Sequence, residues 1–207
     1  MQQVYSPNML KTFELCRKKF YFKYVKNITM PVNDEIFELG KNIHAIASYY
    51  LKKENIDKLE KSLLPAEKKL WEDLKKTCYF IYETIAAEYN LSIKLGDYIF
   101  GGRLDALVKN NEIYYVLDYK TGSAPKNATY DYQTIIYLLA VSEFYKTNDV
   151  EFIYLDLKNK SEVKIKLTNE LKTEYKNKLI EIASMINNED YSTKQKDCKC
   201  EYKIICY

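Results

Sequence analysis

Two adjoining runs of the chain decide the fold: Tyr98-Ile-Phe-Gly-Gly-Arg-Leu-Asp-Ala-Leu-Val108 and Ile113-Tyr-Tyr-Val-Leu-Asp-Tyr-Lys120. Both runs are rich in β-branched, aromatic and aliphatic residues, and a short polar break around Asn110-Asn111 separates them. This pattern predicts a β-hairpin. The pair Gly101-Gly102 leaves room for a bulge or for a close approach of the backbone.

Three charged residues interrupt these apolar runs: Asp105, Asp118 and Lys120. Asp and Lys are depleted in strands and are rarely buried without a partner. Asp118 and Lys120 share one face of a strand because side chains alternate, and pairing of the hairpin brings Asp105 close to them. Two carboxylates and an ammonium group on a sheet are typical of a catalytic site for a hard cation. The alternative is an ordinary exposed ion pair.

The length of 207 residues is sufficient for one domain with a full hydrophobic core. We expect a single domain in three parts: a mainly helical part over residues 1–90, a catalytic sheet core over residues 91–190 and a cysteine-rich tail over residues 191–207. The net charge of +3 means that any affinity for nucleic acid depends on local patches. No apolar run suits a membrane span or a signal peptide, so we expect a cytoplasmic protein without a membrane partner.

The N-terminal region combines basic and aromatic side chains. Ser6-Pro7 predicts the start of a helix. The basic residues beyond it, interleaved with aromatic ones, suit a phosphate backbone and exposed bases. The alternative is an aromatic core beneath a solvated basic face. The candidate DNA-binding residues are Lys11, Arg17, Lys18, Lys19 and Lys23.

Helical periodicity predicts a helix over residues 35–50, which contains His44, the only histidine of the chain. A lone histidine on a helix is more often structural than a metal ligand. Helices are expected to continue over residues 52–89, with a break at Leu64-Pro65 and with Cys78 as a buried thiol. The core candidates of this region are Trp71, Leu74, Phe80, Ile81 and Ile85.

After a polar loop over residues 123–128, the pattern predicts a helix over residues 130–145. Gln133 and Tyr137 share one face of this helix and could hold a substrate strand. The alternative is a surface glutamine and a core tyrosine. Strands over residues 150–157 and 162–167 and a helix over residues 169–186 follow. This order predicts an α/β or α+β fold with a mixed central sheet flanked by helices.

Three of the five cysteines lie between residues 198 and 206, a spacing that favours metal ligation over a disulfide framework. Cys198, Cys200 and Cys206 need a fourth ligand, and Cys16 is the natural candidate because Cys78 lies in an apolar helical stretch. Four thiolates suit an iron–sulfur cluster or zinc. Such a site would join the two ends of the chain. The alternative is a reduced, unliganded tail.

Taken together, these motifs resemble the PD-(D/E)XK nucleases, which share a restriction-endonuclease-like core. Within that family the chain is similar to the RecB-type exonucleases that carry an iron–sulfur cluster, such as the AddB nuclease domain and the CRISPR-associated RecB-like exonucleases. The order and spacing of several motifs support the resemblance. They are Leu39-Gly-Lys-Asn-Ile-His44, Gly102-Arg-Leu-Asp105, Leu117-Asp-Tyr-Lys-Thr-Gly122, Tyr132-Gln133 with Tyr137, and Phe13-Glu-Leu-Cys16-Arg17 with the tail cysteines.

The resemblance implies a metal-dependent DNA exonuclease that acts on single strands or DNA ends, in recombination, repair, phage or CRISPR processing. It implies that Lys120 orients the attacking water or stabilises charge on the phosphate, with support from Gln133 and Tyr137. The implied ligands of Mg²⁺ or Mn²⁺ are His44, Asp105, Asp118 and the backbone carbonyl of Tyr119. The implied ligands of a [4Fe-4S] cluster are Cys16, Cys198, Cys200 and Cys206.

The chain departs from the family pattern at two places. The spacing Cys198-x-Cys200-x5-Cys206 replaces Cys-x-x-Cys-x5-Cys, so zinc stays the alternative metal. The CRISPR-associated branch more often has Glu where this chain has Asp118, so the motif leans toward the recombination-type branch. The chain lacks the P-loop motif of a helicase motor, so we expect either a free-standing nuclease or a subunit of a larger machine, whose partner would be a helicase or another DNA-processing subunit. Two alternatives are a non-catalytic DNA-binding scaffold subunit with a cysteine-bound structural metal, and a zinc-stapled structural protein.

Overall fold

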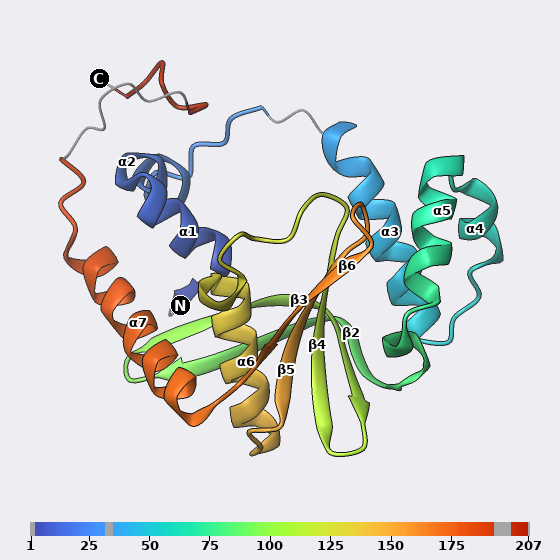
Figure 1. Cartoon of the computed structure of the whole chain (residues 1–207). Coiled ribbons are helices and arrows are strands. Elements are labelled where there is room, and N and C mark those ends of the chain that lie inside the picture. The colour runs from blue at the N-terminus through green and yellow to red at the C-terminus, as the bar shows by residue number, and fades with distance from the viewer. Residues whose placement is uncertain (1–2, 32–34, 193–199, 207) are drawn as a thin grey trace.

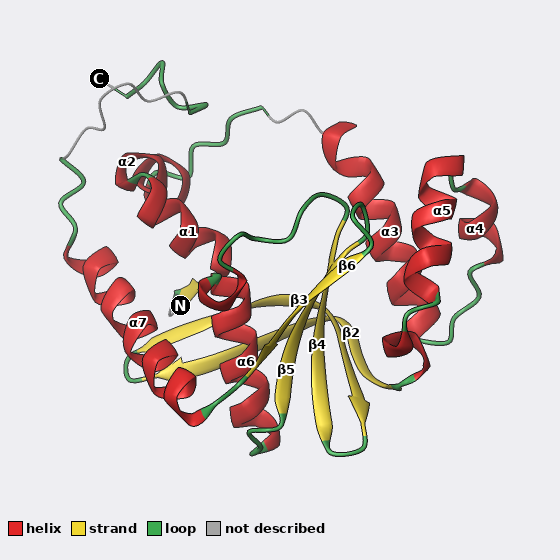
Figure 2. Cartoon of the chain, in the orientation of Figure 1, coloured by secondary structure: helices red, strands yellow, loops and turns green. Residues whose placement is uncertain are grey.

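The computed structural model describes residues 3–31, 35–192 and 200–206. Within these residues six strands form one mixed sheet in the order β1-β3-β4-β5-β6, and β2 pairs with β3 off this path. The expected α/β architecture with a mixed central sheet and flanking helices is confirmed (Figures 1 and 2). No helix in the described part of the chain is long and apolar enough to cross a membrane.

The predicted hairpin is the centre of the sheet. Strands β3 (Tyr98–Asn110) and β4 (Ile113–Lys120) are antiparallel, and their turn places Asn111 at a φ of 52°. Strand β2 (Glu83–Leu95) is antiparallel to β3 along almost its whole length. The remaining strands are β1 (Val4–Tyr5), parallel to β3, β5 (Val150–Asp156), parallel to β4, and β6 (Ser161–Lys166), antiparallel to β5.

Helices cover both faces of this sheet (Figure 1). Helices α1 (Pro7–Leu15), α6 (Tyr132–Tyr145) and α7 (Asn169–Asn188) pack on one face. Helices α3 (Glu35–Leu51) and α5 (Pro65–Lys75) pack on the other. The shorter helical elements are α2 (Arg17–Phe20), η1 (Tyr21–Val25), α4 (Asp57–Ser62), η2 (Cys78–Ile81) and η3 (Ala128–Tyr130).

Each face of the sheet has its own hydrophobic cluster. The first cluster lies under α1, α6 and α7 and includes Leu91, Phe100 and Leu104 from the sheet. The second cluster lies under α3 and α5 and includes Ala87 and Ala106. Burial of this apolar surface on both faces is the main stabilising contribution to the domain and fixes the register of the strands.

Two helix starts predicted from the sequence are confirmed. Ser6 caps α1, since its Oγ accepts a hydrogen bond of 3.3 Å from the backbone N–H of Met9, and Pro7 occupies the first turn. Helix α5 begins at Pro65, after the predicted break. These caps satisfy backbone N–H groups that a helix leaves unpaired at its start.

The helical region expected to reach Tyr89 ends earlier, at the short helix η2, and strand β2 begins at Glu83. The physical reason is pairing: the backbone N–H and C=O groups of this segment bond to β3, and this long-range contact overrides the local helix preference. Two further expectations were wrong. The tight turn of η2 directs Ile81 and Cys78 toward solvent, so Ile81 is 83% exposed and Cys78 is an exposed thiol.

The ladder along one edge of β3 is interrupted. Strand β1 pairs with residues 99–100 of β3 and β4 pairs with residues 106–110, so residues 101–105 lie between the two partners. A side chain replaces one of the missing strand-to-strand hydrogen bonds: the Tyr137 hydroxyl donates a 3.0 Å hydrogen bond to the backbone carbonyl of Arg103. Asp105 stands at the end of this interruption.

Candidate active site

Asp105 and Asp118 face each other across β3 and β4. The last ladder pair at this end is Ala106 with Leu117, so the next position sets Asp105 opposite Asp118. The ladder opens there, and Asp105 Oδ2 accepts a 2.9 Å hydrogen bond from the backbone N–H of Tyr119. The hairpin therefore brings the two carboxylates together, as the sequence predicted.

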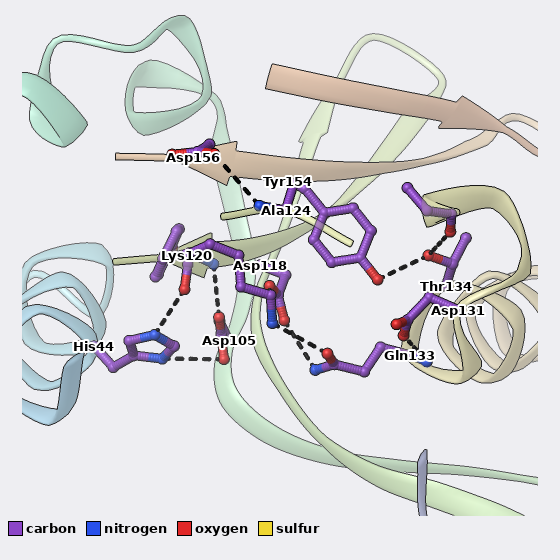
Figure 3. A network of polar contacts seen from close by, with 12 residues as sticks. His44, Asp105, Asp118, Lys120, Ala124, Asp131, Gln133, Thr134, Tyr154 and Asp156 are labelled. Carbon is purple, nitrogen blue, oxygen red and sulfur yellow. Dashed lines mark hydrogen bonds and ion pairs between the residues drawn. The ribbon is translucent and has the colours of Figure 1, made fainter. Parts of the chain in front are cut away.

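His44 extends from α3, which packs on the face of the sheet opposite α6, and contacts Asp105 (Figure 3). Its Nδ1 lies 3.2 Å from Asp105 Oδ1, and its Nε2 lies 3.0 Å from the carbonyl oxygen of Tyr119. Burial alone would lower the pKa of His44, but the hydrogen bond and the charge of Asp105, with the Tyr119 carbonyl, outweigh it and raise the pKa. His44 thus lies among oxygen atoms that attract positive charge.

Asp118 and Lys120 share one face of β4, as the alternation of the strand predicted, and Lys120 Nζ lies 2.7 Å from Asp118 Oδ2. Gln133 from α6 contacts both: its Nε2 donates to Asp118 Oδ1 at 2.9 Å, and its Oε1 accepts from Lys120 at 3.1 Å. A carboxamide is suited to this bridge because it offers a donor and an acceptor at once. Figure 3 shows Gln133 holding the two charged groups from the helix side.

Burial raises the pKa of Asp118 to about 6, and the negative charge of Asp105 adds to this effect. Lys120 acts in the opposite direction but does not cancel it. The carboxylate is therefore ionised at neutral pH at an electrostatic cost. A cation bound between Asp105 and Asp118 would relieve that cost.

Tyr137 lies one turn after Gln133 on α6 and contacts the backbone of β3 rather than the carboxylates. A Cβ atom built on Gly102 would lie 2.7 Å from the Tyr137 hydroxyl oxygen, so any other residue there would force the Tyr137 side chain to shift. The close backbone approach expected of Gly101-Gly102 is therefore present. Tyr137 holds the interrupted edge of β3 next to Asp105 through its hydrogen bond to Arg103.

Glu88 is a site residue that sequence reasoning missed. The ladder pairs Ala87–Ala106 and Tyr89–Leu104 place it opposite Asp105, on the side away from Asp118. Its Oε1 lies 3.8 Å from His44 Nδ1. No sequence motif marks Glu88, because its position depends on a register between two strands that local pattern does not determine.

The donor set suits a hard divalent cation. Among the described residues, one group of three brings its potential ligand atoms within 4.8 Å of one another: His44, Glu88 and Asp105. Asp118 and the Tyr119 carbonyl lie directly beside it. Carboxylate and carbonyl oxygens with one imidazole are ligands that Mg²⁺ and Mn²⁺ accept.

The basic residues of the N-terminal helices mostly contact protein groups. Four of the five candidates have a partner, and the pairs are Lys11–Asp131 at 2.6 Å, Arg17–Glu189 at 2.6 Å, Lys19–Glu201 at 3.1 Å and Lys18 with the Tyr191 carbonyl at 2.9 Å. Lys23 lies over the ring of Tyr24. These contacts tie α1 and α2 to α6, α7 and the C-terminal segment.

Residues 200–206 pack against the segment that follows Cys16, the residue between α1 and α2. The Tyr202 hydroxyl donates a 2.7 Å hydrogen bond to the carbonyl of Ile28, and the rings of Phe22 and Tyr202 stack. Cys16 Sγ accepts a 3.4 Å hydrogen bond from the backbone N–H of Lys19. Cys16, Cys200 and Cys206 are all partly buried, whereas Cys198 lies outside the described residues. Residues 200–206 therefore lie against residues 19–28, which follow Cys16 in the chain.

Comparisons with known proteins agree on one family. The model described as the PD-(D/E)XK nuclease superfamily matches residues 4–207. The CRISPR-associated exonuclease Cas4 of Francisella tularensis subsp. novicida is 30% identical over 129 residues, which is 60% of this chain and 64% of that protein. The match thus spans less than two thirds of the relative's length.

A solved structure shows the same fold. It belongs to a provisionally assigned exonuclease from Eubacterium rectale and aligns with a TM-score of 0.56 at 13% identity, over 97% of this chain and 92% of that one. At this identity the likeness concerns the architecture: a mixed central sheet with helices on both faces.

Proposed function

The chain belongs to the PD-(D/E)XK nuclease superfamily, and from this premise we propose that it hydrolyses DNA phosphodiester bonds at the site on β3 and β4. The observation that supports the proposal most directly is the contact of Asp118 with both Lys120 and Gln133, with Asp105 opposite. The chemistry needs a water made nucleophilic and a phosphate whose developing charge is neutralised.

The protein groups divide this work. Asp105 and Asp118 concentrate negative charge that attracts a divalent cation to the open end of the hairpin. Lys120, whose side chain is 26% exposed, reaches the surface of the site and can orient water or balance charge on the phosphate. Gln133 fixes the positions of Asp118 and Lys120 relative to each other.

Mg²⁺ or Mn²⁺, bound through His44, Asp105, Asp118 and the Tyr119 carbonyl, would lower the pKa of a bound water and supply positive charge next to the phosphate. The contacts of His44 support this assignment, because both of its nitrogens already lie beside oxygen atoms of the same ligand set. Tyr137 would support the site through the backbone of β3.

The substrate in this proposal is single-stranded DNA or a DNA end. The combination of basic and aromatic side chains on α2 and η1 supports it. Lys18 and Lys26 lie over the ring of Tyr21 and Lys23 lies over the ring of Tyr24, so a base could stack on these rings once the lysine moves to a phosphate. A relative that is named an exonuclease also favours attack from an end. Lys23 would contact phosphates directly. A phosphate contact by the other four would require Lys11 to leave Asp131, Arg17 to leave Glu189, Lys19 to leave Glu201 and Lys18 to leave the Tyr191 carbonyl.

We further propose that Cys16, Cys198, Cys200 and Cys206 bind a [4Fe-4S] cluster, with zinc as the alternative metal. The packing of Tyr202 and Glu201 on the segment that contains Cys16 supports this assignment. The cluster would have a structural role by joining the two ends of the chain, and a helicase or another DNA-processing subunit would supply the substrate strand.

The proposal is tested with labelled single-stranded DNA in linear and circular form, with Mg²⁺ or Mn²⁺ and with a chelator. We expect progressive shortening of the linear strand, no cutting of the circle and no reaction in the chelator. Equal cutting of the circle would replace the exonuclease by an endonuclease. Binding of DNA without cleavage under all conditions would favour the non-catalytic scaffold.

A further inference from the structure

Glu88 lies at a break that two neighbouring strands share. In β2, Ala87 packs in the second cluster whereas Leu91 packs in the first, although alternation would set them on one face. In β3, Leu104 belongs to the first cluster and Ala106 to the second. Both changes of face occur where Glu88 and Asp105 lie opposite each other.

The backbone of Glu88 accounts for the break. Its φ of 50° is in the left-handed region, which is uncommon for residues other than glycine and is irregular within a strand. Irregularities of this kind re-aim a side chain next to active sites. Here the result is that Glu88 Oε1 points to His44 Nδ1, at 3.8 Å, instead of lying on a regular strand face.

The three side chains have the spacing of a cation site. In an octahedral Mg²⁺ or Mn²⁺ site with ligand distances of about 2.1 Å, neighbouring ligand atoms are about 3 Å apart and opposite ones about 4.2 Å. His44 Nδ1 lies 3.2 Å from Asp105 Oδ1 and 3.8 Å from Glu88 Oε1, and the three ligand atoms lie within 4.8 Å of one another. Small side-chain adjustments therefore bring them to one ion.

The second oxygen of Glu88 is held separately. Its Oε2 lies 2.7 Å from Arg103 Nε, while the Arg103 side chain is 66% exposed and its backbone carbonyl is fixed by Tyr137. One carboxylate oxygen is thus anchored, and the other is presented to His44 and Asp105. An anchored carboxylate is typical of a metal ligand, because outer partners orient the ligating group.

The net negative charge of the site also favours the binding of a cation. Glu88, Asp105 and Asp118 are three acids within one cross-strand row, against two permanent positive charges, on Arg103 and Lys120. A divalent ion would balance this excess.

We propose that Glu88 is a direct ligand of the active-site cation, with His44 and Asp105, and that Arg103 is the positioning residue that aligns it. This inference rests on the proposed function, because it concerns the same metal site. It adds a third strand, β2, to the two that build the site.

The test is the affinity for Mn²⁺ without DNA, measured by the free-Mn²⁺ electron paramagnetic resonance signal and by calorimetry on the full chain. Glu88→Gln keeps the shape of the side chain and removes its charge. Glu83→Gln, at an exposed glutamate of the same strand, is the matched control. We expect Glu88→Gln to weaken Mn²⁺ binding at least about tenfold and Glu83→Gln to leave it within about twofold.

The variant Arg103→Gln distinguishes a direct ligand role of Glu88 from a role that depends only on its ion pair with Arg103. If Glu88 is a ligand, Arg103→Gln changes Mn²⁺ affinity less than Glu88→Gln, because it leaves the ligand charge in place. Equal weakening by the two variants would overturn the ligand role and leave an ion pair that acts through structure. An affinity for Glu88→Gln equal to that of Glu83→Gln would also overturn it.

Asp118→Asn in the same series keeps the two proposals distinguishable. If Asp118→Asn weakens Mn²⁺ binding while Glu88→Gln does not, the inference about Glu88 fails and the proposed metal site stands. If the wild-type chain binds no Mn²⁺, both fail together. Circular dichroism of each variant checks that the fold is retained.

Discussion

Glycine at position 102 and the tyrosine that contacts it show how single residues shape the site. Gly102→Ala places a Cβ atom 2.7 Å from the Tyr137 hydroxyl oxygen, so the ring must shift and its hydrogen bond to Arg103 is lost. We expect this variant to lower the free energy of unfolding by about 1–3 kcal/mol, measured by urea denaturation.

Tyr137→Phe is the companion variant, because it removes the oxygen that clashes. The next ring atom, Cζ, lies 3.6 Å from the added Cβ, an ordinary contact. Alone, Tyr137→Phe should cost about 1 kcal/mol for the lost hydrogen bond. In the double variant we expect a loss of unfolding free energy that is smaller than the sum of the two single losses. Strictly additive losses would show that the added Cβ atom does not contact the Tyr137 hydroxyl.

Asp118 makes the stability of the metal-free chain depend on pH. Its pKa is about 6 in the fold and near 3.8 in an unfolded chain, mainly because burial disfavours the carboxylate. The folded state therefore binds the proton more tightly, so this contribution to stability is full below about pH 4 and is lost as the pH rises through about 6.

Asp118→Asn keeps the side chain neutral at every pH. In thermal unfolding with a chelator, we expect the variant to gain stability relative to wild type between pH 4.5 and pH 7.5, since only the wild type has an ionised carboxylate at the higher value. If the difference in thermal stability between the two proteins does not change with pH, burial does not raise the pKa of Asp118 in the fold.

The site residues differ in how well the sequence predicts them. Some lie in a short local motif, whereas one depends on the alignment of two strands. Asp118 and Lys120 lie two positions apart on one strand, so their contact follows from local alternation. Glu88 meets Asp105 only through the alignment of β2 with β3 and a left-handed backbone. Neither feature has a local signature, and for that reason Glu88 was not among the predicted site residues.

At the scale of elements, α5 fixes the helix that carries His44. Glu67 in the first turn of α5 is 4% exposed; it accepts a 2.7 Å hydrogen bond from the backbone N–H of Leu64 and a 2.8 Å bond from Asn42 of α3. Asn42 lies two residues before His44, so this contact sets the position of α3 over the sheet.

Glu67→Ala should lower the free energy of unfolding by about 1–3 kcal/mol, because it leaves the Leu64 N–H group and the Asn42 amide without this partner. The control is Glu72→Ala, at an exposed glutamate of the same helix, which should change stability by less than about 0.5 kcal/mol. Urea unfolding of both variants checks the pair. Equal changes in unfolding free energy for the two variants would show that the effect comes from helix propensity and not from the contact of Glu67 with α3.

Strong local patterns predicted most elements of the sheet and the helices correctly. The hairpin, the helix of His44, the break before Pro65 and the two C-terminal strands all have clear periodicity or turn residues. Strand β2 does not: Glu83-Thr-Ile-Ala-Ala-Glu-Tyr89 contains good helix formers, and its pairing with β3 decides its structure. The exposure of Cys78 could not be predicted for the same reason, since it depends on where that helical region stops.

At the scale of the whole molecule, the C-terminal segment closes the chain onto its beginning. Glu201 pairs with Lys19, and Tyr202 bonds to Ile28, which places residues 200–206 next to α2 and the segment after it (Figure 1). A metal bound by cysteines from both ends would restrict the unfolded chain and add to stability.

For anaerobically purified protein, we expect visible absorption typical of an iron–sulfur cluster and about four irons per chain. Cys16→Ser should lose the absorption and the iron, whereas Cys78→Ser, at the exposed thiol outside the proposed ligand set, should retain both. A colourless protein with zinc would assign the alternative metal. Loss of iron in the Cys78 variant as well would contradict the proposed ligands.

The proposed function requires that hydrolysis takes place at Asp105, Asp118 and Lys120. The most direct measurement is Mg²⁺- or Mn²⁺-dependent cleavage of a labelled single-stranded DNA by the wild type, by Asp118→Asn and by Asp149→Asn, an exposed aspartate used as the matched control. We predict cleavage by the wild type and the control variant, and a rate at least about 10²-fold lower for Asp118→Asn with the fold retained. Cleavage by Asp118→Asn at the wild-type rate would show that hydrolysis does not depend on this carboxylate, contrary to the proposed function.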